Sequence, residues 1–568
     1  MVSLKNASAT KPFLFRSDYV SDLFNVQRAR RSLLVISVIA LLMLIVNYTY
    51  EYRQHIYGLM PSLDSNEEKS TKHDTPRPNN LHVLMTAQNK DVNICKLSLG
   101  LSLFDYPAPT VIGWESRFDQ HLLGGGSHLA KISLVLEHLK SLLDSGHQAS
   151  DLVFMLDAFD IWVQLPWQAL LARYHSINSA ENKRIYQRMG KAAAKEHVEQ
   201  TIVFGAGKRC APNDLYSIAC FAIPDSPLPK DLYGANTDSS IGINGAASYR
   251  QRYLNSGYAI GPLGDMYRLF VFAERRLNLC MTYNSRNPSP SDPGDNTPGF
   301  CYGGSDQSIF ADLFGEQEFH REIMRRHHHT WLDSVLEFFW RSRPGSKRPN
   351  AILLGAVIDD VVDPSFSHET MDTTYLPGKP HEFGIGLDYF SELGHQTINS
   401  EEPEDAQYLF YNESIAGQLK PRSVVACPLN EKLASATDED PAAALPKDIW
   451  TWPLPGVDGP SWPASISLYT HLCLGVVPAM IHHNGKKGRR EKDWDKLWYQ
   501  KQLPAMMNAG VKASGETPWT RMKPGIWTVE AGKEKKFLPW VDACPTEYDQ
   551  ALYGAGFDRG TTPLPEGF

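Results

Sequence analysis

The chain lacks the features that would assign it to several common classes of protein. Its 568 residues include only eight cysteines, none spaced as C-x-x-C, so a zinc or thioredoxin-type site has no support. Positive charge is not in excess, because the formal net charge is −8, and this excludes a basic nucleic-acid surface over the whole protein. Proline (38) and glycine (41) are near average usage, which excludes a collagen-like or low-complexity chain. With 42% hydrophobic residues, the chain is expected to be a large globular protein.

Long apolar runs are also absent, with one exception near the N-terminus. Residues 32–50 read SLLVISVIALLMLIVNYTY without a charge, and as a helix they would span about 28 Å, close to the hydrocarbon thickness of a bilayer. Arg30 and Arg31 precede the run and Glu51 follows it, so the positive-inside tendency predicts a cytosolic tail at 1–31. A cleaved signal peptide fits less well, because no small-x-small site follows the run. We therefore expect a type II signal anchor with the body of the protein on the lumenal side.

A lumenal body meets an oxidising compartment, where cysteines form disulfides. Cys210 with Cys220, and Cys280 with Cys301, are close enough in sequence to pair, and the remaining cysteines leave the connectivity open. The triplet N-E-S at Asn412 is an acceptor for N-glycosylation in such a compartment. Disulfides and a glycan are therefore expected in this part of the chain.

Beyond the anchor, the sequence predicts a stem and an α/β body. Residues 51–80 are polar and are expected to form the stem. Short apolar runs typical of buried strands then alternate with helical spacing, which places strands at 81–85, 152–156 and 201–204 and helices at 127–143 and 308–314. This alternation predicts a mostly parallel sheet with helices on both faces. Residues 489–568 have weak periodicity and are expected to be a C-terminal appendage of irregular structure.

Asp157 and Asp160 form the sharpest local motif. They follow the apolar strand at 152–156 in the phrase D-A-F-D, so both carboxylates are expected at the C-terminal end of a strand, where open α/β sheets bind ligands. Two carboxylates at this spacing can converge on one hard divalent cation, and they repel each other without one. A solvated turn that caps the next helix is the alternative.

Further candidates combine polar side chains with turn or helix signals. The glycines at 124–126 lead into a helix N-terminus, where bare N–H groups suit an anionic ligand, although a flexible turn explains them equally. Asp306, in the phrase S-D-Q, is either a catalytic carboxylate or the N-cap of a helix. His482 and His483 follow an apolar stretch, and a histidine there is either a metal ligand or structural.

The order of these motifs resembles a known family. The phrases MLDAFDIWVQLP at 155–166, YLNSGYAIGP at 253–262, SDQSIF at 305–310 and HHNG at 482–485 are similar, in this order, to the glycosyltransferase domain of lysyl hydroxylases and procollagen glycosyltransferases. The resemblance implies a UDP-sugar-dependent domain with the Rossmann-like GT-A fold. It places this domain at 81–488, with insertions.

The resemblance also implies roles for individual residues. The metal, Mn²⁺ or Mg²⁺, would be held by Asp157, Asp160 and His482. The nucleotide would lie against Thr86, Trp114, Gly124, Gly125 and Gly126. The donor sugar or the acceptor would face Asn255, Asp306 and Gln307. The sequence differs from the family pattern at Ser305, where the family often has a second carboxylate, and this difference bears on the role of Asp306.

Together these observations lead us to expect a Golgi or ER membrane protein whose lumenal domain transfers a hexose from a UDP-hexose to a hydroxyl group. The acceptor would be a protein or a glycan, the membrane would be reached through one helix, and nucleic acid would not be a partner. A metal-dependent hydrolase is one alternative. A non-catalytic, glycosyltransferase-like binding or scaffold protein is the other, and the departure at Ser305 favours it.

Overall fold

The computed structural model describes residues 80–116, 127–213, 217–240, 245–286, 305–331, 374–400, 405–420, 427–449, 462–500, 503, 525–530, 534–555 and 557. All of them belong to one unit of the chain, Asp74–Phe568. The predicted tail and anchor, and the stem up to residue 79, lie outside the described residues. Within the described ranges, no helix is both long enough and apolar enough to cross a bilayer.

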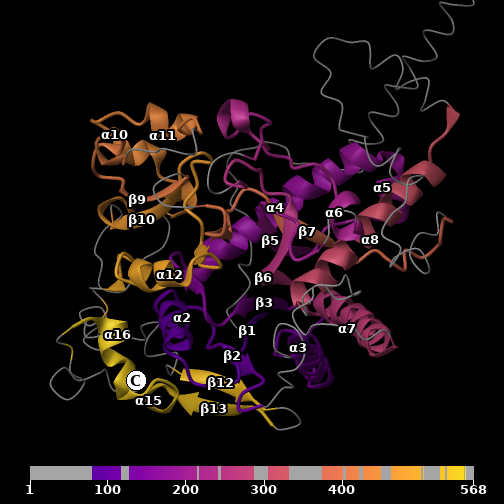
Figure 1. The fold of residues 1–568 in the computed structure, drawn as a ribbon, viewed down its shortest axis with the longest axis horizontal. Coiled ribbons are helices and arrows are strands. Elements are labelled where there is room, and N and C mark those ends of the chain that lie inside the picture. The colour runs from indigo at the N-terminus through magenta and orange to yellow at the C-terminus, as the bar shows by residue number, and fades with distance from the viewer. Residues whose placement is uncertain are drawn as a thin grey trace, which may run out of the picture. The chain divides into compact units, whose positions relative to one another are not determined.

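An eight-stranded sheet in the described part of the chain forms the centre of the fold, in the order β13-β12-β2-β1-β3-β6-β5-β7 (Figure 1). Its strands are β1 (Leu81–Thr86), β2 (Thr110–Ile112), β3 (Leu152–Asp157), β5 (Ile202–Gly207), β6 (Tyr253–Pro262), β7 (Ile385–Asp388), β12 (Gly525–Val529) and β13 (Lys536–Pro539). β6 runs antiparallel to β3 and β5, and β13 runs antiparallel to β12. The other neighbouring strands are parallel, which confirms the expected mostly parallel sheet.

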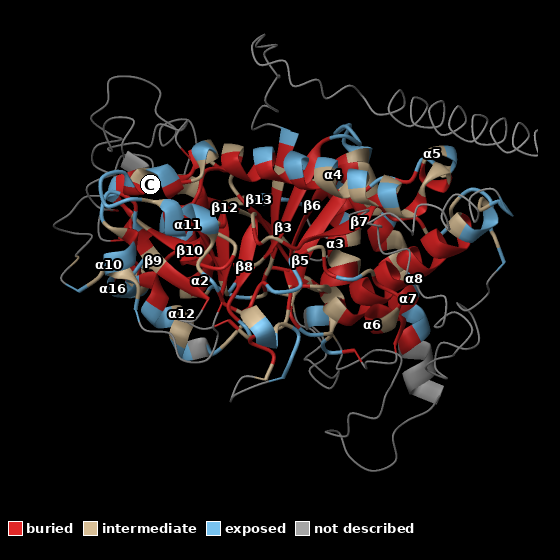
Figure 2. Cartoon of the chain, turned by 90° about the horizontal axis from the view of Figure 1, so that it is seen from above, coloured by how far each residue is buried: buried red, intermediate tan, exposed pale blue. Residues whose placement is uncertain are grey.

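Helices cover both faces of this sheet. The helices of one face are α2 (Val92–Leu103) and α4 (Trp167–Met189), and those of the other are α3 (Ser127–Asp144), α7 (Leu263–Arg286) and α8 (Asp306–His327). Because side chains alternate along a strand, Phe154 of β3 packs in the first core and Val153 in the second. Figure 2 shows the strands buried between the two layers. The predicted α/β class is therefore confirmed.

Most of the predicted elements are present, although α8 is much longer than the stretch 308–314. Its last turns carry polar residues that are nevertheless buried, because Arg321 pairs with Glu318 and with Glu382. Hydrophobic spacing cannot reveal a helix whose buried face holds ion pairs, and the prediction therefore ended too early.

The segment 489–568 differs from the predicted irregular appendage, because its strands belong to the main sheet. β12 pairs in parallel with β2, and in Figure 1 the yellow C-terminal strands lie beside the indigo N-terminal ones. The carbonyl of Val529 accepts hydrogen bonds from the backbone N–H groups of Gly113 and Trp114, at 2.9 and 3.2 Å. A disulfide joins Cys544 to Cys95 of α2 across 449 residues of chain. Short strands with such distant partners leave little local signal in a sequence.

Two further disulfides join described residues. Cys210 pairs with Cys220, as predicted, and Cys427 pairs with Cys473. Cys301, which is the predicted partner of Cys280, lies outside the described residues.

Two small sheets accompany the main sheet. β8 (Gly394–Gln396), β11 (Met480–His482) and β4 (Ile161–Val163) form one, with β11 in the middle, and β9 (Ala406–Phe410) pairs with β10 (Ser467–His471) in the other. β4 directly follows the D-A-F-D turn, so its antiparallel pairing with β11 brings the C-terminal part of the chain to that turn.

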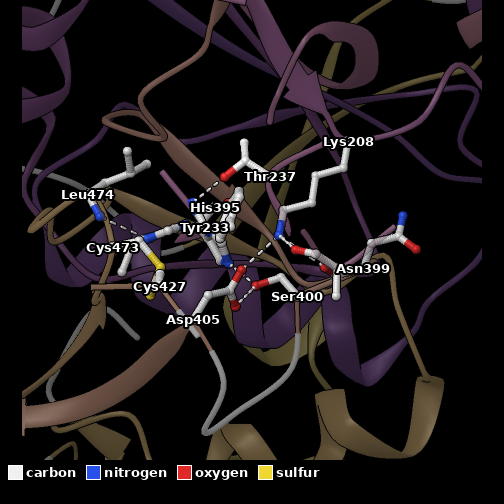
Figure 3. Close-up of a disulfide and its surroundings, with 12 residues drawn as sticks. Lys208, Tyr233, Thr237, His395, Asn399, Ser400, Asp405, Cys427, Cys473 and Leu474 are labelled. Carbon is white, nitrogen blue, oxygen red and sulfur yellow. Dashed lines mark hydrogen bonds and ion pairs between the residues drawn. A yellow bond between two sulfur atoms is a disulfide. The ribbon is translucent and has the colours of Figure 1, made fainter. Parts of the chain in front are cut away.

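A buried ion pair holds the segment between β8 and β9 against the main sheet (Figure 3). The ammonium of Lys208 lies 2.8 Å from Asp405 and donates to the backbone carbonyl groups of Ala247 and Asn399, at 2.7 and 3.1 Å. Asp405 also accepts a hydrogen bond from the hydroxyl of Ser400. Burial alone would raise the pKa of Asp405, but Lys208 lowers it below its usual range, so the carboxylate stays charged.

The variant Asp405→Asn tests this ion pair. It leaves the Lys208 ammonium buried without its partner, and breaking a buried pair in this way is expected to cost about 3–5 kcal/mol of the free energy of unfolding. Urea titration of the full-length protein, followed by tryptophan fluorescence, measures the loss.

Two further variants control that measurement. Lys208→Met/Asp405→Leu removes both charges and should recover most of the lost stability. Asp144→Asn is the matched control, since Asp144 is exposed and pairs with Lys140 at the surface, where such pairs contribute about 0–1 kcal/mol. If Asp405→Asn costs no more than Asp144→Asn, the buried pair does not hold this segment.

Candidate metal and substrate site

A cavity of about 490 Å³ opens at the C-terminal ends of β1 and β3. Thr86 at the end of β1, Lys131 of α3 and the turn Asp157–Asp160 line it, together with the segment 87–91. The side chain of Phe159, between the two aspartates, is exposed beside it. This end of the parallel strands is where open α/β sheets bind ligands, and the volume lies within the range of small-molecule sites.

Asp157 and Asp160, which line this cavity, converge with the buried side chain of His482. Asp157 is the last residue of β3, Asp160 lies in the turn before β4, and His482 is the residue of β11 that pairs with Ile161 of β4. The Nε2 atom of His482 lies 3.5 Å from Oδ1 of Asp160 and 4.0 Å from Oδ2 of Asp157. The structure therefore brings together the three residues that the resemblance implies as metal ligands, although they are far apart in sequence.

His482, rather than His483, faces the two carboxylates. Neighbouring residues of a strand point to opposite faces, and the ring of His483 lies against Trp162, with its Nδ1 atom 3.7 Å from Asp493. His483 contributes its backbone instead, because its N–H donates to the carbonyl of Asp160 at 2.6 Å. This bond helps to fix the turn that carries Asp160.

The side chains of this group suit a divalent cation. Burial, together with the nearby carboxylates of Asp160 and Asp306, raises the pKa of Asp157 against the lowering effect of Lys131. Burial alone would lower the pKa of His482, but the Asp160 carboxylate raises it, so the group attracts positive charge. Oδ1 of Asp160 is buried and receives no regular hydrogen bond from the described residues. Two carboxylates and one imidazole are ligands that Mn²⁺ accepts, whereas Mg²⁺ prefers oxygen alone.

Gly257 of β6 leaves the space that the His482 ring occupies. A Cβ atom at this position would lie 2.0 Å from Cε1 of His482, far inside van der Waals contact. A glycine inside a strand often marks such a close approach. The glycine of the phrase N-S-G is therefore explained by the position of the histidine.

Lys131 is the site residue that the sequence did not reveal. Its side chain is only 4% exposed, and its Nζ atom lies 2.8 Å from Oδ1 of Asp157 and 3.1 Å from Oδ2 of Asp306. Burial alone would lower its pKa, but the two carboxylates raise it above the usual range, so the ammonium stays charged. In the sequence, a lysine beside an apolar helical stripe is typical of a solvated position, and only the fold shows its two partners.

Asp306, Gln307 and Asn255 lie together where α8 begins. The hydroxyl of Ser305 accepts a hydrogen bond from the N–H of Gln307 at 3.2 Å, so Ser305 is the N-cap of α8 and the alternative role of Asp306 as the cap is wrong. The side-chain amide of Asn255 donates to Oε1 of Gln307 at 2.7 Å. The Gln307 amide in turn donates to the carbonyl of Ala211. Asp306 is therefore free to pair with Lys131.

The residues that the resemblance places around the nucleotide do not all line this cavity. Thr86 lines the cavity, at the end of β1. Trp114 follows β2 but does not line this cavity; it is 5% exposed and packs in the core of the α2 and α4 face. Gly124, Gly125 and Gly126 lie outside the described residues.

Gly257→Ala is expected to weaken Mn²⁺ binding by about 10–100-fold, the usual effect of disturbing the support of a metal ligand. The added methyl group would push the His482 ring away from Asp160. Gly207→Ala, on the neighbouring strand β5, is the matched control, since its Cβ would meet no atom closer than 3.6 Å. Calorimetric titration with Mn²⁺ compares the two variants. Equal affinities would show that the position of His482 does not matter for the metal.

The comparisons with known proteins do not add to this geometry. No family model matches the chain, and no curated protein matches it. What the site does is therefore inferred from its side chains and from the order of the sequence motifs.

Proposed function

We propose that the chain is a metal-dependent glycosyltransferase of the GT-A fold, which transfers a hexose from a UDP-hexose to a hydroxyl group of a protein or glycan. The observation that carries this proposal is the convergence of Asp157, Asp160 and His482 at the end of β3, beside a cavity of about 490 Å³. The mostly parallel sheet with helices on both faces agrees with this fold.

The charges at the site suit the departure of a nucleoside diphosphate. Mn²⁺ or Mg²⁺ held by Asp157, Asp160 and His482 would neutralise the negative charge that develops on UDP as the glycosidic bond breaks. Lys131 supplies a fixed positive charge beside them, and its ion pairs keep two carboxylates apart and in place. Because these groups are already paired before substrate binds, little reorganisation is needed during the reaction.

The groups around Asp306 suit the sugar and the acceptor. Asp306 pairs with the same Lys131 ammonium as Asp157 and directly precedes Gln307, whose side-chain amide is paired with that of Asn255. A carboxylate and two amides offer both hydrogen-bond acceptors and donors, which is the combination that binds hydroxyl groups. We propose that the transferred hexose and the accepting hydroxyl meet here.

We also propose that the body of the protein is lumenal, in the Golgi or the ER, behind an anchor at 32–50. The disulfides Cys95–Cys544, Cys210–Cys220 and Cys427–Cys473 support an oxidising compartment. Asn412 is exposed after β9, as a glycosylation acceptor must be.

UDP release from a panel of UDP-hexoses by the full-length protein tests the reaction. With Mn²⁺, one preferred donor is expected. Activity should fall by about 10²–10³-fold or more with EDTA or in Asp160→Asn, because the charge on the leaving group is no longer neutralised. Asp144→Asn, an exposed aspartate at the end of α3, is the matched control and should keep full activity.

The other outcomes separate the alternatives. Turnover of a substrate without any acceptor and without tight UDP binding favours a metal-dependent hydrolase. UDP binding without turnover favours a binding or scaffold protein. A folded protein that neither binds UDP nor releases it from any donor overturns the proposal.

Lys131→Met tests the bridging ammonium separately. Loss of this charge leaves the Asp157 and Asp306 carboxylates facing each other, and kcat for UDP release is expected to fall by about 10²–10³-fold. Lys140→Met, on the exposed side of the same helix, should leave kcat unchanged. Steady-state rates of the two variants give the comparison, and equal rates would remove Lys131 from the mechanism.

A further inference from the structure

A second group of potential metal ligands lies at the opposite end of the parallel strands from the candidate active site. His82 is the second residue of β1, Asp151 directly precedes β3, and His147 lies in the turn after α3. β1 and β3 are parallel, with Leu81 opposite Leu152, so their first residues meet at one edge while Thr86 and Asp157 meet at the other. The group is therefore separate from the site described above.

We propose that His82, His147 and Asp151 form a zinc site. The Nε2 atom of His82 lies 3.7 Å from Oδ2 of Asp151, and the Nδ1 atom of His147 lies 3.5 Å from the same oxygen. Ligand atoms around a tetrahedral Zn²⁺ with bonds of about 2.0–2.1 Å are separated by about 3.4 Å. The two measured separations thus lie within a few tenths of an ångström of those in a zinc site.

The two imidazoles and the carboxylate are available as ligands. The Nε2 atom of His82 is buried and has no hydrogen-bond partner among the described residues. The backbone N–H of Gln148 donates to Oδ2 of Asp151 at 3.0 Å and so fixes the carboxylate. In the part of the chain that the structure describes, no lysine or arginine forms an ion pair with Asp151.

Within the described ranges, the carboxylate of this group is not paired with a lysine or arginine, and solvent can reach the group. His138 and Lys535 lie near His82, but among the described residues neither forms an ion pair with Asp151. A third group, which contains His395, Asp405 and His471, differs in this respect, because all three of its residues are buried. Its carboxylate already pairs with the Lys208 ammonium and accepts a hydrogen bond from Ser400 (Figure 3).

The site is open on one side. The side chain of His147 is 41% exposed, so an ion can enter from solvent and a water molecule can complete a tetrahedral shell. Two histidines and one carboxylate are a common set of protein ligands for Zn²⁺. A zinc ion here would join the start of β1, the end of α3 and the start of β3, and would therefore stabilise the folded state by mass action.

Zinc titration of the full-length protein tests this site. The background variant is Asp160→Asn, which disables the candidate active-site metal group and so separates this inference from the proposed function. After removal of metals with a chelator, competition with a zinc indicator should show one tight zinc per chain. Co²⁺ in its place should give the visible absorption of a tetrahedral complex.

His147→Ala is the decisive variant, because this exposed side chain can be removed without disturbing the core. Zinc affinity should fall by about 100-fold or more, since even changes outside the ligand set cost about 10–100-fold. His197→Asn is the matched control; His197 is exposed, and its left-handed backbone (φ 49°) suits asparagine. Zinc should also raise the unfolding temperature of His197→Asn and not of His147→Ala. Equal zinc affinities in the two variants would overturn the proposal.

Discussion

Repulsion among three carboxylates is the constraint on which the site depends. Asp157, Asp160 and Asp306 gather at the end of β3, where the Lys131 ammonium pairs with Asp157 and Asp306 and the His482 ring faces Asp157 and Asp160. These five residues come from β3, the turn after it, α3, α8 and β11. Moving any one of them therefore changes the electrostatic interactions of the others. A site of this kind favours a ligand that brings further positive charge, such as a divalent cation.

This arrangement requires parts of the chain that are far apart in sequence. β4 and β11 pair so that His482 reaches the turn of Asp160, and Gly257 of β6 leaves the room that its ring needs. On its other side, β11 pairs with β8. The ion pair of Lys208 with Asp405 fixes the chain after β8. The histidine is thus positioned by backbone pairing on two sides, rather than by the few residues around it.

The sequence predicts the local parts of this structure well. Short apolar runs locate β1, β3 and β5, and a helical stripe locates α3, because strands buried on both faces and a helix buried on one face leave patterns in consecutive residues. The D-A-F-D turn was recognised because its two carboxylates lie close together in sequence. Lys131 was missed because its partners come from other elements, and the end of α8 was missed because ion pairs replace apolar residues on its buried face. The strands at 525–529 and 536–539 were missed because only distant pairing makes them strands.

The late pairing of β12 with β2 has a consequence for synthesis in the cell. Cys95 and Cys544, which lock this edge of the sheet, are separated by 449 residues, and at about 5–20 residues per second the ribosome needs roughly 20–90 s to make that length. During this time β2 is an open edge with unpaired N–H and C=O groups, which other strands can join. The nascent chain is therefore exposed to wrong strand pairing until its last strands arrive, and formation of the Cys95–Cys544 bond marks the closure of this edge.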